Sequence, residues 1–290
     1  MQRHPLITPA ELAARLSGGP GDAPLILDVR WQLGADDGYD EYLQGHLPGA
    51  VFVDLERDLS GVRTEGGVGG RHPMPTVDDF ELDMAECGVD NDRPIVVYDD
   101  SNQLAAARAW WLLRHFGKYD VQVLDGGIRA WRAERHPIES GLRMVEEGDF
   151  SIRRSRINVL DADQAALYAK EGLLIDARPA DRFRGQNETV DPVAGHIPGA
   201  VNVPARSLVD ADGSFHPPQR LREIFEVAGI DGQTPVAAYC GSGVQASHVA
   251  LAIAAAGLDI EVPVYIGSWS DWISDRSRPI QVDSPAESVF

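Results

Sequence analysis

The most constraining feature of this sequence is that its second half repeats the first. Three segments of the first half recur in the second half in the same order and with similar residue types. The pairs are residues 25–30 and 173–178, residues 45–51 and 195–201, and residues 126–131 and 267–272. A repeat with a kept order indicates a tandem duplication, so the two halves should share one fold.

Each half alternates short apolar segments with segments of helix formers. The first repeated segment reads Leu-Ile-Leu-Asp-Val-Arg, which is typical of a buried strand, and capping boxes at Thr8 and Asp161 open the helix before it in each half. The alternation predicts an α/β fold with a mainly parallel sheet in each half. At 290 residues the chain is long enough for two domains, each with its own core. We predict a domain over residues 1–140, a polar linker over 141–157 and a second domain over 158–290.

The chemistry of the chain is expected around Cys240. An apolar strand over residues 235–239 leads into this cysteine, and a six-residue loop over 241–246 precedes a helix that ends at Gly257. Backbone N–H groups at a helix start lack intrahelical partners and favour an anion or a thiolate. Gly241 and Gly243 let the backbone curl around the sulfur. A buried structural cysteine is the commoner fate of a lone Cys, but this loop favours a nucleophile.

The repeat also provides a comparison within the chain. Asp99 stands in the first half at the position of Cys240, and Asp-Ser-Asn follows it where Gly-Ser-Gly follows the cysteine. The first half therefore lacks both the thiol and the glycines. We predict that only the second domain is a reaction centre, and that the first contributes to a cleft between the domains.

Charge and cysteine usage limit the function classes. The formal net charge of −19 disfavours binding to nucleic acid or to an anionic membrane. The two cysteines, Cys87 and Cys240, form neither a disulfide framework nor a zinc-binding spacing, which suits a reducing cytosol. The first residues contain no apolar signal core, and the apolar stretch over residues 249–258 is too short to span a bilayer. We expect a cytoplasmic protein without a metal or organic cofactor.

Each repeat carries an Asp-x-Arg motif and a Gly-His-(Leu/Ile)-Pro-Gly-Ala motif, and the second repeat adds the loop cysteine. In this combination the chain resembles the two-domain rhodanese-type sulfurtransferases over nearly its whole length. The resemblance implies two rhodanese-like domains and a reaction in which Cys240 takes sulfane sulfur from a small-molecule donor. The resulting persulfide would then pass to cyanide or to a thiol acceptor, such as a thioredoxin-like protein.

Within that family, the residues after the cysteine distinguish two donor classes. Thiosulfate enzymes typically carry cationic side chains there, whereas mercaptopyruvate enzymes typically have Cys-Gly-Ser-Gly-Val-Thr-Ala. The present loop is similar to the latter, with Gln in place of Thr, and a loop without Lys or Arg offers less to a dianion than to a monoanionic keto acid. The resemblance favours 3-mercaptopyruvate over thiosulfate and implies donor contacts from Gly241, Gly243, Val244, Gln245 and Ala246.

The resemblance implies further site residues. A Ser–His–acid relay proposed for the mercaptopyruvate enzymes falls on Ser242, His72 and Glu56, the last at a position where the family usually has Asp. Arg182 matches an arginine that binds the anionic end of the donor. A second donor-binding arginine of the mercaptopyruvate class falls on Asp191, so that contact is expected to be absent.

Several of these residues also have ordinary structural interpretations. His72 lies in a glycine-rich segment, residues 58–76, which we interpret as a mobile loop. The sequence therefore leaves open a plain surface histidine at His72 and a plain surface arginine at Arg182.

Three other functions can be compared with sulfur transfer. A cysteine phosphatase of related fold needs Cys-x5-Arg, and Ala246 stands where that arginine would be. A cysteine hydrolase needs an oriented base, for which His72 is the candidate. The non-enzymatic alternative is a persulfide carrier that delivers sulfur to a partner protein without fast small-molecule turnover. The intact Cys240 loop and Arg182 favour the enzyme.

Overall fold

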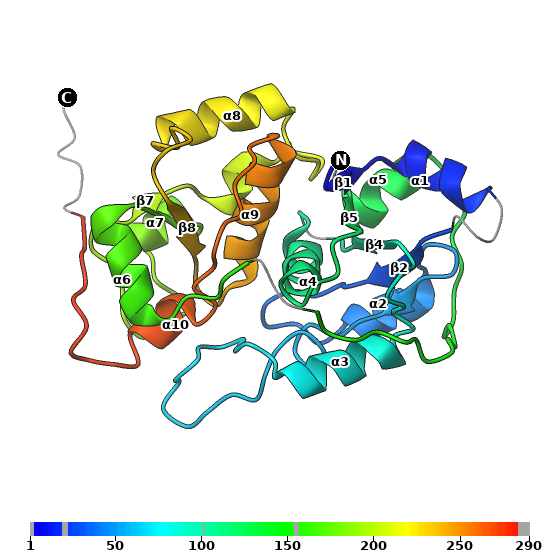
Figure 1. The fold of residues 1–290 in the computed structure, drawn as a ribbon, viewed down its shortest axis with the longest axis horizontal. Helices are drawn as coiled ribbons and strands as arrows, with labels where there is room; N and C mark the ends of the chain where they lie inside the picture. The colour runs from blue at the N-terminus through cyan, green and yellow to red at the C-terminus, as the bar shows by residue number, and fades with distance from the viewer. Residues whose placement is uncertain (1–2, 19–22, 101, 154–156, 284–290) are drawn as a thin grey trace.

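The computed structural model describes residues 3–18, 23–100, 102–153 and 157–283. It has two lobes, one for each half of the chain, and each lobe is built on a parallel sheet flanked by helices (Figure 1). This arrangement confirms the α/β class and the duplication predicted from the repeat. Residues 154–156 of the expected linker, and Ser101 near Asp99, lie outside the described residues.

The first lobe contains a five-stranded sheet in the order β1-β5-β4-β2-β3, with all paired strands parallel. Its strands are β1 (Leu6–Ile7), β2 (Leu25–Asp28), β3 (Val51–Phe52), β4 (Ile95–Tyr98) and β5 (Val121–Leu124). Its helices are α1 (Pro9–Leu16), α2 (Gly38–Gln44), α3 (Val77–Glu86), α4 (Leu104–His115) and α5 (Gly127–Ala133). Every residue of β2 and β4 is buried, as expected for strands covered on both faces.

The second lobe contains a three-stranded parallel sheet in the order β7-β6-β8. Its strands are β6 (Leu173–Asp176), β7 (Val201–Asn202) and β8 (Val236–Tyr239). Its helices are α6 (Ala162–Glu171), α7 (Ala180–Phe183), the 3-10 helix η1 (Ala205–Leu208), α8 (Pro218–Val227), α9 (Val244–Ala255) and α10 (Ser268–Trp272). No helix in the described parts of the chain combines the length and the apolar character needed to cross a bilayer.

Local signals in the sequence place the starts of α1 and α6 correctly but not the start of α9. Both expected capping boxes form, at Thr8 and at Asp161. The helix after Cys240, however, begins at Val244, so the predicted six-residue loop has only three residues, 241–243. The reason is Gly243, whose φ of 84° turns the chain directly into α9.

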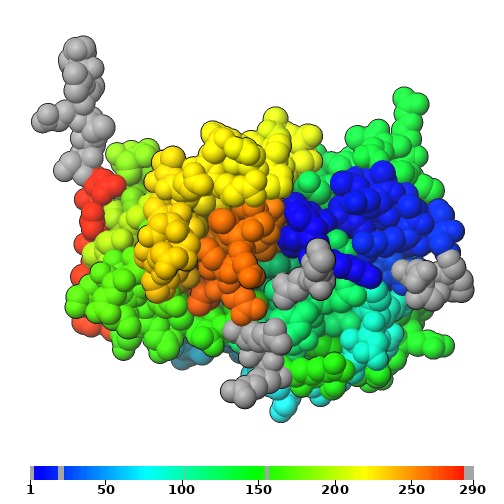
Figure 2. All heavy atoms as spheres, turned by 45° about the horizontal axis from the view of Figure 1, so that its top comes forward, coloured from blue at the N-terminus to red at the C-terminus, as the bar shows by residue number. Residues whose placement is uncertain are grey.

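Part of the hydrophobic core is shared by the two lobes. α4 and α9 lie side by side between the lobes (Figure 1), and most residues of both helices are buried, as in helices surrounded by protein. A single cluster of buried apolar side chains runs through both lobes across these helices. The N-terminal segment also packs against the end of α9 (Figure 2), where a ring nitrogen of His4 lies 3.4 Å from the Ala255 carbonyl oxygen. Each lobe also has an apolar cluster of its own, so the shared cluster comes in addition to the separate cores expected from the length.

Residues 69–71 of the segment interpreted as a mobile loop are docked on the second lobe, whereas residues 62–68 are exposed. The Gly69 N–H donates to Asp271 Oδ1 at 2.7 Å, and the Arg71 N–H donates to Ser270 Oγ at 3.1 Å. Between them, Gly70 has a φ of 83°, and a Cβ there would lie 2.3 Å from the Gly267 carbonyl oxygen. The glycines of this segment thus allow close contact between the lobes.

Candidate active site

Cys240 follows β8 directly and lies at the N-terminus of α9. The Gly243 N–H donates to its Sγ at 3.1 Å, and the Cys240 N–H donates to Ser268 Oγ at 3.0 Å. The Trp269 N–H donates to the Cys240 carbonyl at 2.9 Å, which ties the residue to α10. Unpaired N–H groups and the dipole at a helix start stabilise negative charge, so this position suits a thiolate or a persulfide.

The first lobe has an anion at the corresponding place. The Asp99 carboxylate follows β4 and accepts hydrogen bonds from the Gln103 N–H at 3.0 Å and the Ala106 N–H at 2.9 Å. Both lobes therefore place an acidic or nucleophilic side chain at the start of a buried helix. In the first lobe this side chain is a carboxylate that caps α4.

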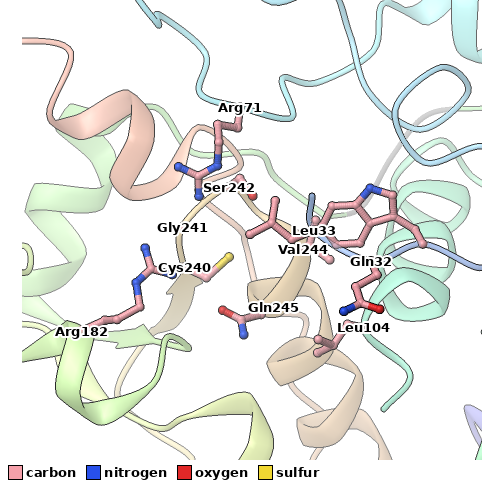
Figure 3. A pocket seen from close by; sticks show the side chains of 11 residues that line it. Gln32, Leu33, Arg71, Leu104, Arg182, Cys240, Gly241, Ser242, Val244 and Gln245 are labelled. Atoms are coloured by element: carbon pink, nitrogen blue, oxygen red, sulfur yellow. The ribbon is translucent and has the colours of Figure 1, made fainter. Parts of the chain in front are cut away.

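A cavity of about 270 Å³ opens at Cys240 between the lobes (Figure 3). The second lobe lines it with Arg182, Cys240, Gly241, Ser242, Val244 and Gln245, and the first with Trp31, Gln32, Leu33, Arg71 and Leu104. Ala246 does not line the cavity, because it is fully buried within the first turn of α9. The donor contact that the resemblance implied for Ala246 is therefore not supported, whereas Val244 and Gln245 do face the cavity.

The three residues of the expected relay are in contact. His72 Nδ1 lies 2.8 Å from Ser242 Oγ, and His72 Nε2 lies 2.9 Å from Glu56 Oε1. The imidazole is fully buried, so His72 is not the surface histidine that the sequence left open. Trp31 completes the arrangement, since its indole N–H donates to Glu56 Oε1 at 3.2 Å and its ring meets the imidazole edge-on.

The direction of these hydrogen bonds follows from the charge state of His72. Burial lowers the pKa of His72 to about 4, and Glu56 only partly opposes this effect. The ring is therefore neutral at neutral pH. Because an ionised Glu56 can only accept, Nε2 carries the proton and Nδ1 accepts from the Ser242 hydroxyl. This arrangement lets Ser242 give up a proton to His72.

Arg182 reaches the cavity from α7, held by two carboxylates. Its Nε donates to Glu188 Oε1 and Oε2 at 3.0 and 2.9 Å, and its Nη2 donates to Asp191 Oδ2 at 2.8 Å. Asp191 also forms an ion pair with Arg71 of the first lobe. The resemblance placed a second arginine at position 191. In the structure this position holds the Asp191 carboxylate, which binds Arg71 from the first lobe.

Arg108 lies beneath the cysteine loop, on α4. It has no exposed surface, and its Nη2 donates to the carbonyls of Leu59, His72 and Pro73 at 3.1, 3.3 and 3.2 Å. Its Nη1 has no hydrogen-bond partner among the described residues, and a Cβ on Gly243 would lie 2.9 Å from that atom. Burial lowers the pKa of Arg108 to about 10, while the charge of Cys240 opposes that effect. The guanidinium therefore remains charged at neutral pH.

The sequence does not single out Trp31, Arg71 or Arg108. Trp31 directly follows the first Asp-x-Arg motif and Arg71 directly precedes His72, so adjacency to motifs was an available signal for these two. Arg108 falls within a run of helix formers and carries no local signal. Within the described ranges, no group of three His, Cys, Asp or Glu side chains is arranged to hold a metal ion.

Comparison with known proteins agrees with this geometry. A family model described as the rhodanese-like domain matches twice, over residues 8–134 and 161–275. A putative thiosulfate sulfurtransferase of Mycobacterium tuberculosis is 45% identical over 95% of this chain and 96% of its own length. A probable 3-mercaptopyruvate sulfurtransferase of Pseudomonas aeruginosa is 43% identical over 95% of this chain and 97% of its own. The crystal structure of a 3-mercaptopyruvate sulfurtransferase from Escherichia coli superposes with a TM-score of 0.80 at 34% identity, covering 92% of this chain and 99% of that one.

Proposed function

The chain belongs to the rhodanese family and is a sulfurtransferase, and we propose that it transfers the sulfur of 3-mercaptopyruvate through a persulfide on Cys240. In this reaction the Cys240 thiolate attacks the donor sulfur, and the carbon–sulfur bond breaks with its electron pair left on carbon as the enolate of pyruvate. The proton of the donor thiol reaches that carbon and gives pyruvate. The persulfide then passes its outer sulfur to cyanide, which leaves as thiocyanate, or to a thiol.

The Ser242–His72–Glu56 contact is the observation that supports this choice of donor. Sulfur transfer from mercaptopyruvate moves a proton from sulfur to carbon, whereas transfer from thiosulfate releases sulfite and moves no proton. A neutral imidazole hydrogen-bonded to a serine on the cavity wall is suited to carry that proton. The relay would be idle with thiosulfate.

The remaining cavity residues bind the donor and the persulfide in this proposal. Arg182 binds the donor carboxylate, because it is a cation on the cavity wall beside Cys240. The Gly243 N–H and the start of α9 hold the sulfur that carries the negative charge. Gly241, Val244 and Gln245 shape the wall around it.

Thiosulfate is the second candidate donor. The guanidinium groups of Arg71 and Arg182 both lie near Gly241, so the cavity contains cations that the cysteine loop itself lacks. The name of the Mycobacterium tuberculosis relative also points to this donor.

Initial rates with each donor, and cyanide as acceptor, test the proposal. We expect the wild type to prefer mercaptopyruvate, and Cys240→Ala to lose at least about a thousandfold in rate with either donor. Cys87→Ala is the matched control, because Cys87 is also buried but lies in the first lobe away from the cavity, and it should keep its rate. An active Cys240→Ala variant would exclude the persulfide mechanism. Stoichiometric persulfide loading without turnover would instead favour the carrier function.

We also propose the acceptor class and the compartment. A cysteine persulfide reacts readily with a thiolate, so a small thiol or a thioredoxin-like protein is a suitable physiological acceptor. Both cysteines are free, which fits a reducing compartment such as the cytoplasm. Thiocyanate or sulfide release with each acceptor in turn would rank them.

A further inference from the structure

Arg71 comes to the catalytic cavity from the other lobe. Its backbone is fixed by the hydrogen bond to Ser270 Oγ and by the close approach of Gly70 to Gly267. Its side chain then extends into the cavity that contains Cys240 (Figure 3). Docking of the residues 58–76 segment on α10 therefore determines where this guanidinium lies.

Asp191 joins Arg71 to Arg182. One carboxylate oxygen pairs with Arg71 Nη1, and the other accepts from Arg182 Nη2 at 2.8 Å. The Asp191 side chain is only 2% exposed, so it is held between the two cations rather than being free in solvent. Glu188 fixes the remaining edge of Arg182.

The two guanidinium groups converge over Gly241. A Cβ on Gly241 would lie 2.8 Å from Arg71 Nη2 and 3.9 Å from both Nη atoms of Arg182. In Figure 3 the two side chains approach the Cys240 sulfur from different sides of the loop. Neither Arg71 Nη2 nor Arg182 Nη1 takes part in a hydrogen bond between described residues, so both can donate to a ligand in the cavity.

The charges of this cluster balance. Arg71 and Arg182 supply two positive charges, and Asp191 and Glu188 supply two negative charges at contact distance. The cavity therefore offers directed N–H donors without a net positive charge from these four side chains. Such a site suits a monoanion with carboxylate and keto oxygens better than a dianion, which needs excess positive charge.

We propose that Arg71 is a second donor-binding residue, supplied across the lobe interface, and that Asp191 positions it beside Arg182 and sets the preference for a monoanionic keto acid over thiosulfate. The inference rests on the proposed function, because it takes the Cys240 cavity as the donor site. The resemblance places a second donor-binding arginine at the position of Asp191. In this proposal Arg71 takes that role, and the Asp191 carboxylate holds Arg71 in place.

Two variants separate binding from charge balance. Arg71→Met should raise the KM for mercaptopyruvate roughly tenfold to a hundredfold, with a smaller change in kcat, because it removes a charged hydrogen bond to the donor. Asp191→Asn keeps the shape and removes one negative charge, so it should raise the ratio of kcat/KM for thiosulfate to that for mercaptopyruvate about tenfold. Arg71→Lys should restore part of the loss. Arg184→Met is the control, since Arg184 lies two residues beyond Arg182, bonds to Gln186 and does not line the cavity.

A binding readout makes the result independent of turnover. Pyruvate and sulfate serve as monoanionic and dianionic probes that protect Cys240 from alkylation by iodoacetamide. Arg71→Met should weaken protection by pyruvate, and Asp191→Asn should strengthen protection by sulfate relative to pyruvate. Unchanged pyruvate protection and KM in Arg71→Met, or equal changes for both anions in Asp191→Asn, would overturn the inference. A wild type that binds pyruvate through Arg71 but turns over neither donor would overturn the proposed function alone.

Discussion

His72 illustrates how burial sets the chemistry of a single side chain. The ring has no exposed surface, and its pKa is lowered to about 4 although a carboxylate lies 2.9 Å away. Desolvation therefore outweighs the attraction to Glu56. The result is a neutral base, oriented by its acceptor, at the pH where the enzyme would work. The sequence could indicate His72 by resemblance, but neither its burial nor its lowered pKa, because both depend on the docked lobes.

The lowered pKa predicts how the reaction responds to acid. His72 remains a proton acceptor until the pH falls toward about 4, whereas an ordinary histidine would be protonated below about 6.5. Dividing the mercaptopyruvate rate by the thiosulfate rate cancels the ionisation of Cys240, which both donors require. We expect this ratio to stay level between about pH 7 and pH 5 and to fall only nearer pH 4. Initial rates with both donors across this range provide the measurement.

A variant at the same position provides the control. His72→Gln can form hydrogen bonds but cannot take up a proton, so it should lower the mercaptopyruvate rate by about a hundredfold or more. The thiosulfate rate should stay within about twofold. An equal loss with both donors would show that His72 serves only to hold the loop.

Among the secondary-structure elements, the start of α9 decides the geometry around the sulfur. The sequence predicts the strand, the cysteine and the helix in the right order, because apolar runs and helix formers are local signals. It does not predict that the helix begins three residues early, because that depends on Gly243 adopting a positive φ next to Ile266 and Arg108. The docked segment at residues 58–76 was missed for a similar reason. Its glycines indicate turns, but its contacts with α10 are between lobes.

Gly243→Ala tests this element directly. Gly243 has a φ of 84°, and an added Cβ would lie 2.8 Å from the Ile266 carbonyl oxygen and 2.9 Å from Arg108 Nη1. We expect the first turn of α9 to shift, so that the N–H of residue 243 no longer donates to the Cys240 sulfur. The rate should then fall by about a hundredfold. The free energy of unfolding should fall by about 2 kcal/mol from the backbone conformation and the crowding. Urea unfolding and initial rates measure the two effects.

Gly232→Ala is matched in backbone conformation. Gly232 has a φ of 78°, but nothing lies within 4 Å of the added Cβ. This control should lose about 1 kcal/mol of stability and keep its rate. A Gly243→Ala enzyme with the same modest stability loss and full activity would mean that the amide contact to Cys240 is dispensable.

At the scale of the whole molecule, the first lobe contributes side chains to the site in the second lobe. The repeat predicts that the first lobe, with Asp99 at the cysteine position, does not carry the nucleophile, and in the structure the Asp99 carboxylate caps α4. What the repeat does not reveal is how much the first lobe gives to the second, since that depends on how α4 and α9 pack. Trp31, Arg71 and His72 reach the cavity or its relay from the first lobe, and Arg108 reaches the base of the cysteine loop. The apolar cluster that both lobes share fixes the position of these side chains relative to Cys240.

Arg108 provides the sharpest test of this dependence between the lobes. A fully buried guanidinium is costly, and Arg108 forms no ion pair with a described carboxylate, although three carbonyls accept from its Nη2. A negative sulfur at Cys240 is the opposite charge that acts on it. Arg108→Met removes the positive charge and should slow alkylation of Cys240 by iodoacetamide at neutral pH roughly tenfold. Arg108→Lys retains a charge and should keep most of the alkylation rate. Thermal unfolding of both variants provides the control, because a similar loss of stability in the two would leave the charge as their difference. Equal alkylation rates in the Met and Lys variants would mean that Arg108 only ties together the backbone near His72, and that the first lobe contributes no charge to the nucleophile.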